Sequence, residues 1–289
     1  DRHTPLFNGN VVRVVLRDAN RGDQLPDSEG GVVHVMGRGS SIDPPAVDLT
    51  RASSSDLRLV SWNTLFDGPF TTRADAMERE LNAVDPDVIL FQEIFSHSAS
   101  DVERLLEGWL GGEWYTEHHL GNAIGSRFPI LSTSTPGGRT LMATLDTRAS
   151  LGHELVVINI HLPCCNYFPD RRYAVDQMLA ALRDERHSGV MAEGTPFIIA
   201  GDANLVLFSR TRDAIAQGDI EFESSFGADF SPDWDGTALE LLSSEQTGRR
   251  SAATNLGGLH YWPGVMDYVY YSDSVIEVGN HFILNTAEM

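Results

Sequence analysis

The stretch Gly201-Asp202-Ala203-Asn204-Leu205 follows the apolar run Pro196-Phe197-Ile198-Ile199-Ala200. The apolar run predicts a buried strand, and the polar residues come where that strand ends. Residues two apart in an extended chain point to the same side, so the Asp202 carboxylate and the Asn204 amide can reach one bound group. The stretch therefore predicts a strand that brings functional side chains to the end of a sheet.

Three further apolar runs end in polar residues in the same way. They span 57–63, 88–93 and 155–161, and they end in Asn63, Glu93 and His161. A carboxylate at the end of an apolar strand is costly unless it is ion-paired or bound to a metal. Each residue also has a structural interpretation: Asn63 as a turn residue, Glu93 as the partner of an arginine, and His161 as a hydrogen-bonded core residue.

One more carboxylate lies inside an apolar strand. Asp267 interrupts the run Val265-Met266-Asp267-Tyr268-Val269, and an inward carboxylate in such a place usually orients a partner such as an imidazole. Carboxylates, amides and a histidine together indicate metal-assisted phosphoester cleavage. A Mg²⁺-like ion needs few protein oxygen ligands because it keeps several waters, and it neutralises charge on phosphoryl oxygens. Asp202 would then orient or deprotonate the attacking water.

The charge of the chain limits the chemistry further. The 289 residues include 41 acidic and 21 basic residues, for a net charge of -20, and every basic residue is arginine. The absence of lysine excludes a Schiff base, a phosphate-loop lysine and a lysine nucleophile. The acidic balance argues against a protein that wraps polyanions, although a bound cation can reverse the local field. No apolar run reaches the ~18 residues of a membrane span.

The order of the predicted elements indicates two parts. Residues 1–55 read as two strands, 11–16 and 32–36, followed by a linker over 40–55 that is rich in Pro, Ser and Asp. From residue 56 to 289, strands and helices alternate in a mixed order that favours an α/β sandwich. Predicted helices span 72–84, 100–110 and 171–186, predicted strands include 121–132, 141–145, 154–160, 266–271 and 275–284, and 215–230 is ambiguous.

The two cysteines and the start of the chain support weaker expectations. Cys164 and Cys165 are adjacent, which leaves two interpretations: a strained vicinal disulfide, or, as we favour, two small residues that pack beneath a loop. The chain begins at Asp1 without a methionine, and we expect a processed protein that is secreted or periplasmic.

Five ordered motifs resemble those of the endonuclease/exonuclease/phosphatase superfamily of deoxyribonuclease-like metal-dependent phosphoesterases. They span 59–65, 89–93, 159–162, 201–204 and 266–269, and Asn122 to Pro129 resembles the family's strand before a Ser-Arg-x-Pro turn. The resemblance covers residues 56–289. It implies an α/β fold of four layers, an α/β/β/α sandwich, and chemistry at a divalent metal, with Mg²⁺ favoured over Mn²⁺ or Ca²⁺.

The resemblance also implies roles for single residues. Glu93 corresponds to the principal metal ligand, and Asn63 assists at the metal or the phosphate. His161 would hydrogen-bond a phosphoryl oxygen, while Asp202 would position or activate water. Asn204 would contact the phosphate.

Two further roles and two departures complete the comparison with the family pattern. Asp267 would orient a second, C-terminal histidine, and Arg127 is a candidate for contact with the phosphate. Leu65 stands where some members carry an acidic residue, and Asn280-His281 is all that resembles the family's closing Ser-Asp-His motif. We interpret residues 277–284 as the strand before that motif, with the last strand of the domain missing.

The sequence thus predicts a metal-dependent phosphoric ester hydrolase that hydrolyses a phosphodiester by in-line attack of water. A small or lipid-derived diester is favoured over long nucleic acid because the chain is acidic and has no lysine. Two alternatives remain: a nuclease that acts on DNA or RNA, and a catalytically impaired binding module of the same fold. The sequence indicates no protein partner.

Overall fold

The structure is a computed structural model. It describes residues 11–13, 34–36, 51, 53, 56–165, 167–205, 210–247, 251–255 and 264–284. Near the N-terminus, β1 (Val11–Arg13) and β2 (His34–Met36) pair antiparallel, within the two strands predicted there. Most of the predicted linker lies outside the described residues.

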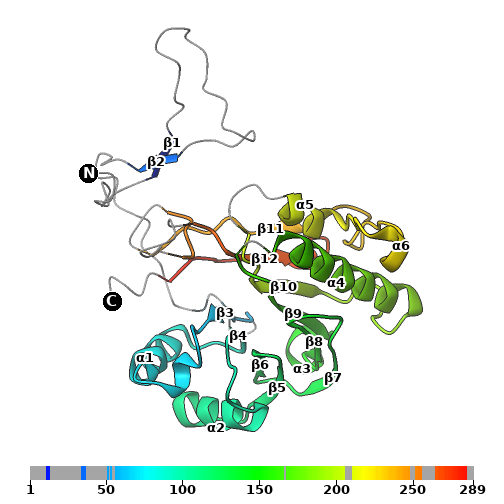
Figure 1. The fold of residues 1–289 in the computed structure, drawn as a ribbon. Coiled ribbons are helices and arrows are strands. Elements are labelled where there is room, and N and C mark those ends of the chain that lie inside the picture. Colours follow the sequence, from blue (N-terminus) through cyan, green and yellow to red (C-terminus); the bar gives the residue numbers. More distant parts are fainter. Residues whose placement is uncertain are drawn as a thin grey trace, which may run out of the picture.

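The main body contains two sheets, shown in Figure 1. The first has the strand order β3-β4-β6-β5, with β3 (Leu59–Asn63), β4 (Val88–Gln92), β5 (Tyr115–His119) and β6 (Asn122–Ser126). The second has the order β11-β12-β10-β9-β8-β7, with β7 (Ile130–Ser134), β8 (Thr140–Leu145), β9 (Leu155–His161), β10 (Phe197–Asp202), β11 (Glu240–Leu241) and β12 (Asp267–Tyr271). Each sheet contains one parallel pair, β3 with β4 and β9 with β10.

The helices begin and end where local signals place them. α2 (Ala99–Leu110) starts at a capping box between Ser98 and Asp101 and ends at Gly111. α1 (Ala74–Val84) ends at Asp85, which has φ of 50° and precedes a proline, so the helix cannot continue. The remaining helices are η1 (Gly68–Phe70), α3 (Arg148–Leu151), α4 (Phe168–Ser188), α5 (Arg210–Gln217) and α6 (Glu223–Phe226).

Three apolar clusters define the layers. One lies between the sheets, where Val88 and Leu90 of β4 meet Leu141 of β8 and Val157 of β9. A second packs α1 and α2 against the other face of the four-stranded sheet, around Phe91 and Trp114. A third packs α4 and α5 against the outer face of the six-stranded sheet. The molecule is therefore an α/β/β/α sandwich of deoxyribonuclease-like fold, as predicted.

The parallel pairs bring their polar ends level. Asp202 at the end of β10 is in register with His161 at the end of β9, and Asn63 at the end of β3 is in register with Gln92 at the end of β4. Gly201 makes this possible in β10. It has φ of 146°, and a Cβ there would lie 2.0 Å from the backbone oxygen of Ile160.

Several predicted elements need correction. Residues 275–284 contain no strand. As far as the structure describes the chain, only Ile283 of this segment forms a bridge, with Gln246, and its backbone bonds to Glu245 and Thr247 do not continue into a ladder of neighbouring pairs. The predicted strand over 121–132 is two strands, β6 and the start of β7, which belong to different sheets. The ambiguous segment 215–230 contains the end of α5 and all of α6.

Candidate functional site

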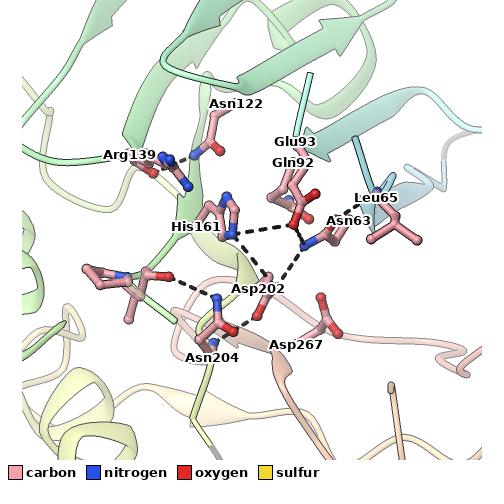
Figure 2. Close-up of polar contacts among 12 residues, drawn as sticks. Asn63, Leu65, Gln92, Glu93, Asn122, Arg139, His161, Asp202, Asn204 and Asp267 are labelled. Atoms are coloured by element: carbon pink, nitrogen blue, oxygen red, sulfur yellow. Dashed lines mark hydrogen bonds and ion pairs between the residues drawn. The ribbon is translucent and has the colours of Figure 1, made fainter. Parts of the chain in front are cut away.

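The ends of four strands from both sheets meet at one place (Figure 2). The contact that joins them is the side-chain amide of Asn63. Its Nδ2 donates to Glu93 Oε1 at 3.0 Å and to Asp202 Oδ2 at 2.8 Å, across 139 residues of sequence. The Asn63 oxygen accepts from the backbone N–H of Leu65 at 3.0 Å, which fixes the amide with its nitrogen toward the carboxylates.

Asp202 is a buried carboxylate whose charge is poorly compensated. Its Oδ1 accepts from the backbone N–H of Asn204 at 2.8 Å, and among the described residues no arginine lies within ion-pair distance of it, although the charge of Arg171 acts on it from farther away. Burial, together with the nearby charge of Asp267, raises the pKa of Asp202 to about 7, against the stabilising hydrogen bonds from Asn63 and Asn204. A carboxylate with such a pKa can accept a proton near neutral pH.

Asp267 lies directly across from Asp202. The two residues are register partners in the antiparallel pair of β10 and β12, and burial also raises the pKa of Asp267, with a smaller opposing effect from Thr254. In the described part of the chain Asp267 makes no hydrogen bond to a histidine. His281, which the family pattern would pair with it, instead has Nδ1 2.9 Å from Ser244 Oγ.

His161 borders the same carboxylates. Its Nε2 lies 3.9 Å from Glu93 Oε1 and 4.0 Å from Asp202 Oδ2, and the residue is 5% exposed. Burial lowers the pKa of His161 to about 4, with a further lowering by Arg139 and a smaller opposing effect from Glu93. The imidazole is therefore neutral at neutral pH, and two carboxylates near Nε2 favour the tautomer that carries the proton there.

Glu93 follows β4 and is held by a neighbouring turn. It has φ of 68°, and its Oε2 accepts from the backbone N–H of Phe66 at 2.9 Å. The backbone N–H of Asp67 donates to the Glu93 carbonyl at 2.8 Å. The Asp67 carboxylate accepts from the backbone N–H groups of Phe95 and Ser96, so one aspartate ties together the loops that follow β3 and β4.

Asn204 joins the site through its backbone more than through its side chain. It has φ of 49°, a conformation that asparagine tolerates well, and its Nδ2 donates to the Leu162 carbonyl at 2.9 Å. This bond links the loops after β9 and β10. One amide hydrogen of Asn204 remains for a bound group.

The structure places Arg127 away from the other predicted site residues. Its guanidinium donates to the carbonyls of Pro86, Leu110 and Gly111 and lies 4.6 Å from the centre of the Trp114 ring. β6 runs antiparallel to β4, so the residue after β6 lies beside the start of β4, whereas Glu93 follows its end. The expected contact of Arg127 with the phosphate is therefore not supported, and its role here is to hold loops.

A different arginine lies at the site. Arg139 precedes β8, its carbonyl accepts from the backbone N–H of His161 at 3.0 Å, and its exposed guanidinium lies 5.0 Å from the centre of the Phe95 ring. Sequence reasoning missed it because the turn Pro136-Gly137-Gly138-Arg139 carries no motif. Both 141–145 and 154–160 were predicted as strands, and their pairing as a hairpin is the signal that could have placed Arg139 next to His161.

A buried amide network forms the floor of the site. Gln92 donates to Asn159 Oδ1 at 2.8 Å, and Asn122 donates to the carbonyls of Arg139 and Asn159. Within the described part of the chain, three buried atoms have no hydrogen-bond partner: His161 Nδ1, Asn122 Oδ1 and Gln92 Oε1; Figure 2 shows Asn122 next to the imidazole. Such unpartnered atoms are costly, which is typical of a place where a water or ligand is bound.

The residues suit a hard cation that keeps most of its waters. Within the described ranges, no three His, Cys, Asp or Glu side chains could hold a metal by themselves. The ligand atoms that the site offers are nevertheless oxygens of Glu93, Asp202 and Asn63, which Mg²⁺ prefers, and a cation would offset the burial of the Asp202 carboxylate and its repulsion by Asp267, which raise the pKa of Asp202. Contact of the Asn63 oxygen with a cation would require rotation of its amide.

The cysteine pair lies on the loop after His161. Cys164 and Cys165 are free and exposed, so they form no disulfide, and the expectation that they pack beneath a loop is wrong. The buried Arg171 holds this loop instead, since it donates to the carbonyls of Pro163 at 2.8 Å and Cys165 at 3.1 Å. Arg171 thus fixes the loop through its backbone, while the two cysteine side chains remain exposed.

Comparison with solved structures agrees with this fold. A β-hairpin deletion mutant of beta toxin from Staphylococcus aureus matches with a TM-score of 0.50 and 16% identity, over 80% of this chain and 91% of that one. A second beta toxin structure, a mutant with bound magnesium ions, matches with a TM-score of 0.51 and 15% identity, over 77% and 86% of the two chains. The catalytic domain of human nocturnin matches with a TM-score of 0.46, 18% identity and coverage of 75% and 83%.

Direct comparison with curated protein sequences gave no significant match. The model of the Endonuclease/Exonuclease/phosphatase family, by contrast, matches residues 60–283, which is more than three quarters of the chain and includes all the site residues described above. Together with the four-layer fold and the convergence of Asn63, Glu93, His161 and Asp202, this match shows that the chain belongs to the endonuclease/exonuclease/phosphatase family, whose members act on phosphoesters.

Proposed function

We propose that this protein is a divalent-cation-dependent phosphodiesterase that uses water as the nucleophile. The observation that carries the proposal is the bridge from Asn63 Nδ2 to Glu93 Oε1 and Asp202 Oδ2, which gathers carboxylates of two sheets beside His161. Glu93, assisted by Asn63, would hold the cation, for which Mg²⁺ fits best. When bound, the cation supplies charge stabilisation at the phosphoryl oxygens.

Asp202 is the proposed base. Its Oδ2 faces the interior of the site, and its raised pKa, about 7, suits removal of a proton from the attacking water near neutral pH. Asn63 and the backbone N–H of Asn204 hold the carboxylate in place through the reaction. The proton passes from the water oxygen to an Asp202 oxygen as the new P–O bond forms and the bond to the leaving group breaks.

His161, Asn204 and Arg139 are the proposed contacts of the phosphoryl group. His161 carries its proton on Nε2 in the favoured tautomer and can donate it in a hydrogen bond to a phosphoryl oxygen. Asn204 has one free amide hydrogen, and the exposed guanidinium of Arg139 lies on the same side of the site. Asp267, which no described histidine meets, raises the basicity of Asp202 through its charge.

The test is chelator-sensitive hydrolysis of bis-p-nitrophenyl phosphate. We expect turnover with Mg²⁺ and none with EDTA, and a loss of ~10³-fold or more in kcat for Asp202→Asn and Glu93→Gln. Glu107→Gln, an exposed residue of α2, is the matched control and should retain activity. Turnover that persists in EDTA, or an active Asp202→Asn protein, would refute the proposal.

The nuclease and the impaired binding module are separated by two companion assays. Plasmid nicking under the same conditions tests for nuclease activity, against which the net charge of -20 argues. Tight Mg²⁺ binding without turnover of any phosphoester would instead identify a binding module.

A secreted or periplasmic location stays a prediction from the sequence.

A further inference from the structure

Large apolar side chains are exposed mainly around the candidate site. Ten such residues are exposed in the described part of the chain, and six of them lie at this one edge, five on loops and Phe168 at the start of α4. They follow β3, β4 and β9 or form the turn between β5 and β6: Leu65, Phe66, Phe95, Leu120, Tyr167 and Phe168. We call Leu65, Phe66, Phe95 and Leu120 the apolar rim. Exposed apolar patches of this kind mark interaction sites.

The backbone is strained in order to present part of this rim. Leu65, Phe66 and Asp67 have φ values of 51°, 52° and 56°, although none is a glycine. Left-handed backbone is unfavourable for leucine and phenylalanine, and here it leaves their side chains 57% and 66% exposed. In the free protein this unfavourable backbone conformation does not bury the two side chains. Such a conformation is expected where a ligand covers the exposed side chains.

The other two members of the rim lie against this turn. The rings of Phe66 and Phe95 are 5.9 Å apart, and Leu120 projects from a hairpin turn with φ of 46° and 58% exposure. Gly121 allows the hairpin to approach, because a Cβ there would lie 2.5 Å from the Phe95 ring. The Arg139 guanidinium lies 5.0 Å from the centre of the Phe95 ring, and the Arg139 carbonyl accepts from the backbone N–H of His161, so the rim is continuous with the side of the site that carries His161.

We infer that the apolar rim seats this protein on a zwitterionic lipid surface, so that the phosphodiester it hydrolyses is that of a lipid headgroup. The inference rests on the proposed function. The rim as a whole is apolar, which suits insertion at the boundary of headgroups and acyl chains, and Leu65 and Leu120, the half of it that is aliphatic, give no stacking face to a base. The net charge of -20 and the absence of lysine disfavour both nucleic acid and anionic membranes.

The test is co-sedimentation with phosphatidylcholine vesicles in EDTA, which measures docking without turnover. The double variant Phe66→Asp/Leu120→Asp removes two rim side chains, and aspartate tolerates the left-handed backbone at both positions. Val190→Asp is the matched control, since Val190 is 74% exposed but follows α4, away from the rim. We expect the wild type and the control to bind and the double variant to bind about 100-fold more weakly.

Each result distinguishes the inference from the proposed function. Wild-type protein that hydrolyses bis-p-nitrophenyl phosphate but fails to bind the vesicles would overturn the inference alone. Vesicle binding without hydrolysis of either substrate would support the docking surface and overturn the proposed function. Equal binding by the double variant and the control, stronger binding to phosphatidylglycerol vesicles, or rim-dependent binding to a single-stranded oligonucleotide would each overturn the lipid assignment.

Discussion

Replacement of Asp202 by asparagine is expected to stabilise the cation-free protein at alkaline pH. The ordinary pKa of this carboxyl is 3.8, and burial with the charge of Asp267 raises it to about 7 in the folded protein. Between these pH values the folded protein keeps a proton that the unfolded chain has released. The free energy of unfolding therefore falls as pH rises through this window, and the loss is complete above pH 7.

The expected size follows from the two pKa values. Their difference corresponds to about 4 kcal/mol, as an upper figure. His161 acts in the opposite direction, because its pKa falls from 6.5 to about 4 on folding, so its contribution to stability rises with pH between those values. The two effects nearly cancel in the wild type. Asp202→Asn removes only the first, so its free energy of unfolding relative to wild type should rise by up to about 4 kcal/mol from pH 4 to pH 8.

The assay is urea unfolding in EDTA, followed by tryptophan fluorescence at several pH values. At pH 4 the buried Asp202 side chain of the folded wild type is neutral, as is the asparagine of the variant, so the two proteins should be about equally stable. Val190→Asn, which introduces the same amide at an exposed position that carries no charge, is the control and should show a difference from wild type that does not vary with pH. A pH-independent difference for Asp202→Asn, or one that falls toward pH 8, would refute the reasoning. Excess Mg²⁺ should stabilise wild type at pH 8 by about 2.7 kcal/mol at 100 times Kd.

Five further substitutions, at four positions, test other parts of the structure. Arg139→Gln should raise KM for a diester about tenfold with little change in the free energy of unfolding. Arg127→Gln should lower the free energy of unfolding by ~1–3 kcal/mol, because the Arg127 guanidinium donates to three loop carbonyls, and it should leave steady-state kinetics unchanged. Asp67→Ala should weaken Mg²⁺ binding in calorimetry and cost about 2 kcal/mol, because the backbone N–H groups of Phe95 and Ser96 lose their acceptor, while Asp67→Asn keeps an acceptor and should behave like wild type. Gly201→Ala should cost at least ~3 kcal/mol in urea unfolding, because the new Cβ meets the Ile160 carbonyl at 2.0 Å; a stable variant would mean that β9 and β10 can separate.

The strand ends were predictable because the signal is local. Asn63, Glu93, His161 and Asp202 each end an apolar run that forms a strand. A polar residue at such a place is an exception to the rule that strands bury apolar groups, and such exceptions are expected at functional sites. Parallel pairing then brings two ends of each sheet level without any further information. The order of the motifs supplied the four-layer fold, although the boundary between residues 1–55 and the rest stays a prediction.

Residues that reach the site from turns were not predictable in the same way. Arg139 and Arg127 each lie next to a strand and within two residues of a glycine, and only the direction of the neighbouring strand separates them. Arg127 follows β6, which runs away from the site, whereas Arg139 precedes β8, which also runs away and so starts at the site. The predicted strand over 275–284 was wrong, since among the described residues only the isolated bridge of Ile283 to Gln246 pairs this segment with another.

The buried carboxylates that end or interrupt apolar strands are conspicuous in the sequence, and they also lower the stability of the folded protein. Asp202 and Asp267 face each other across a ladder that holds their carboxylates together, and burial raises the pKa of both. Asn63 offsets part of this repulsion through neutral hydrogen bonds, but an amide cannot neutralise a charge. A cation at Glu93 can, so its binding relieves a cost that the fold already bears. The same residues therefore lower the stability of the free protein and raise its affinity for the cation, which links the pH dependence of unfolding to the proposed chemistry.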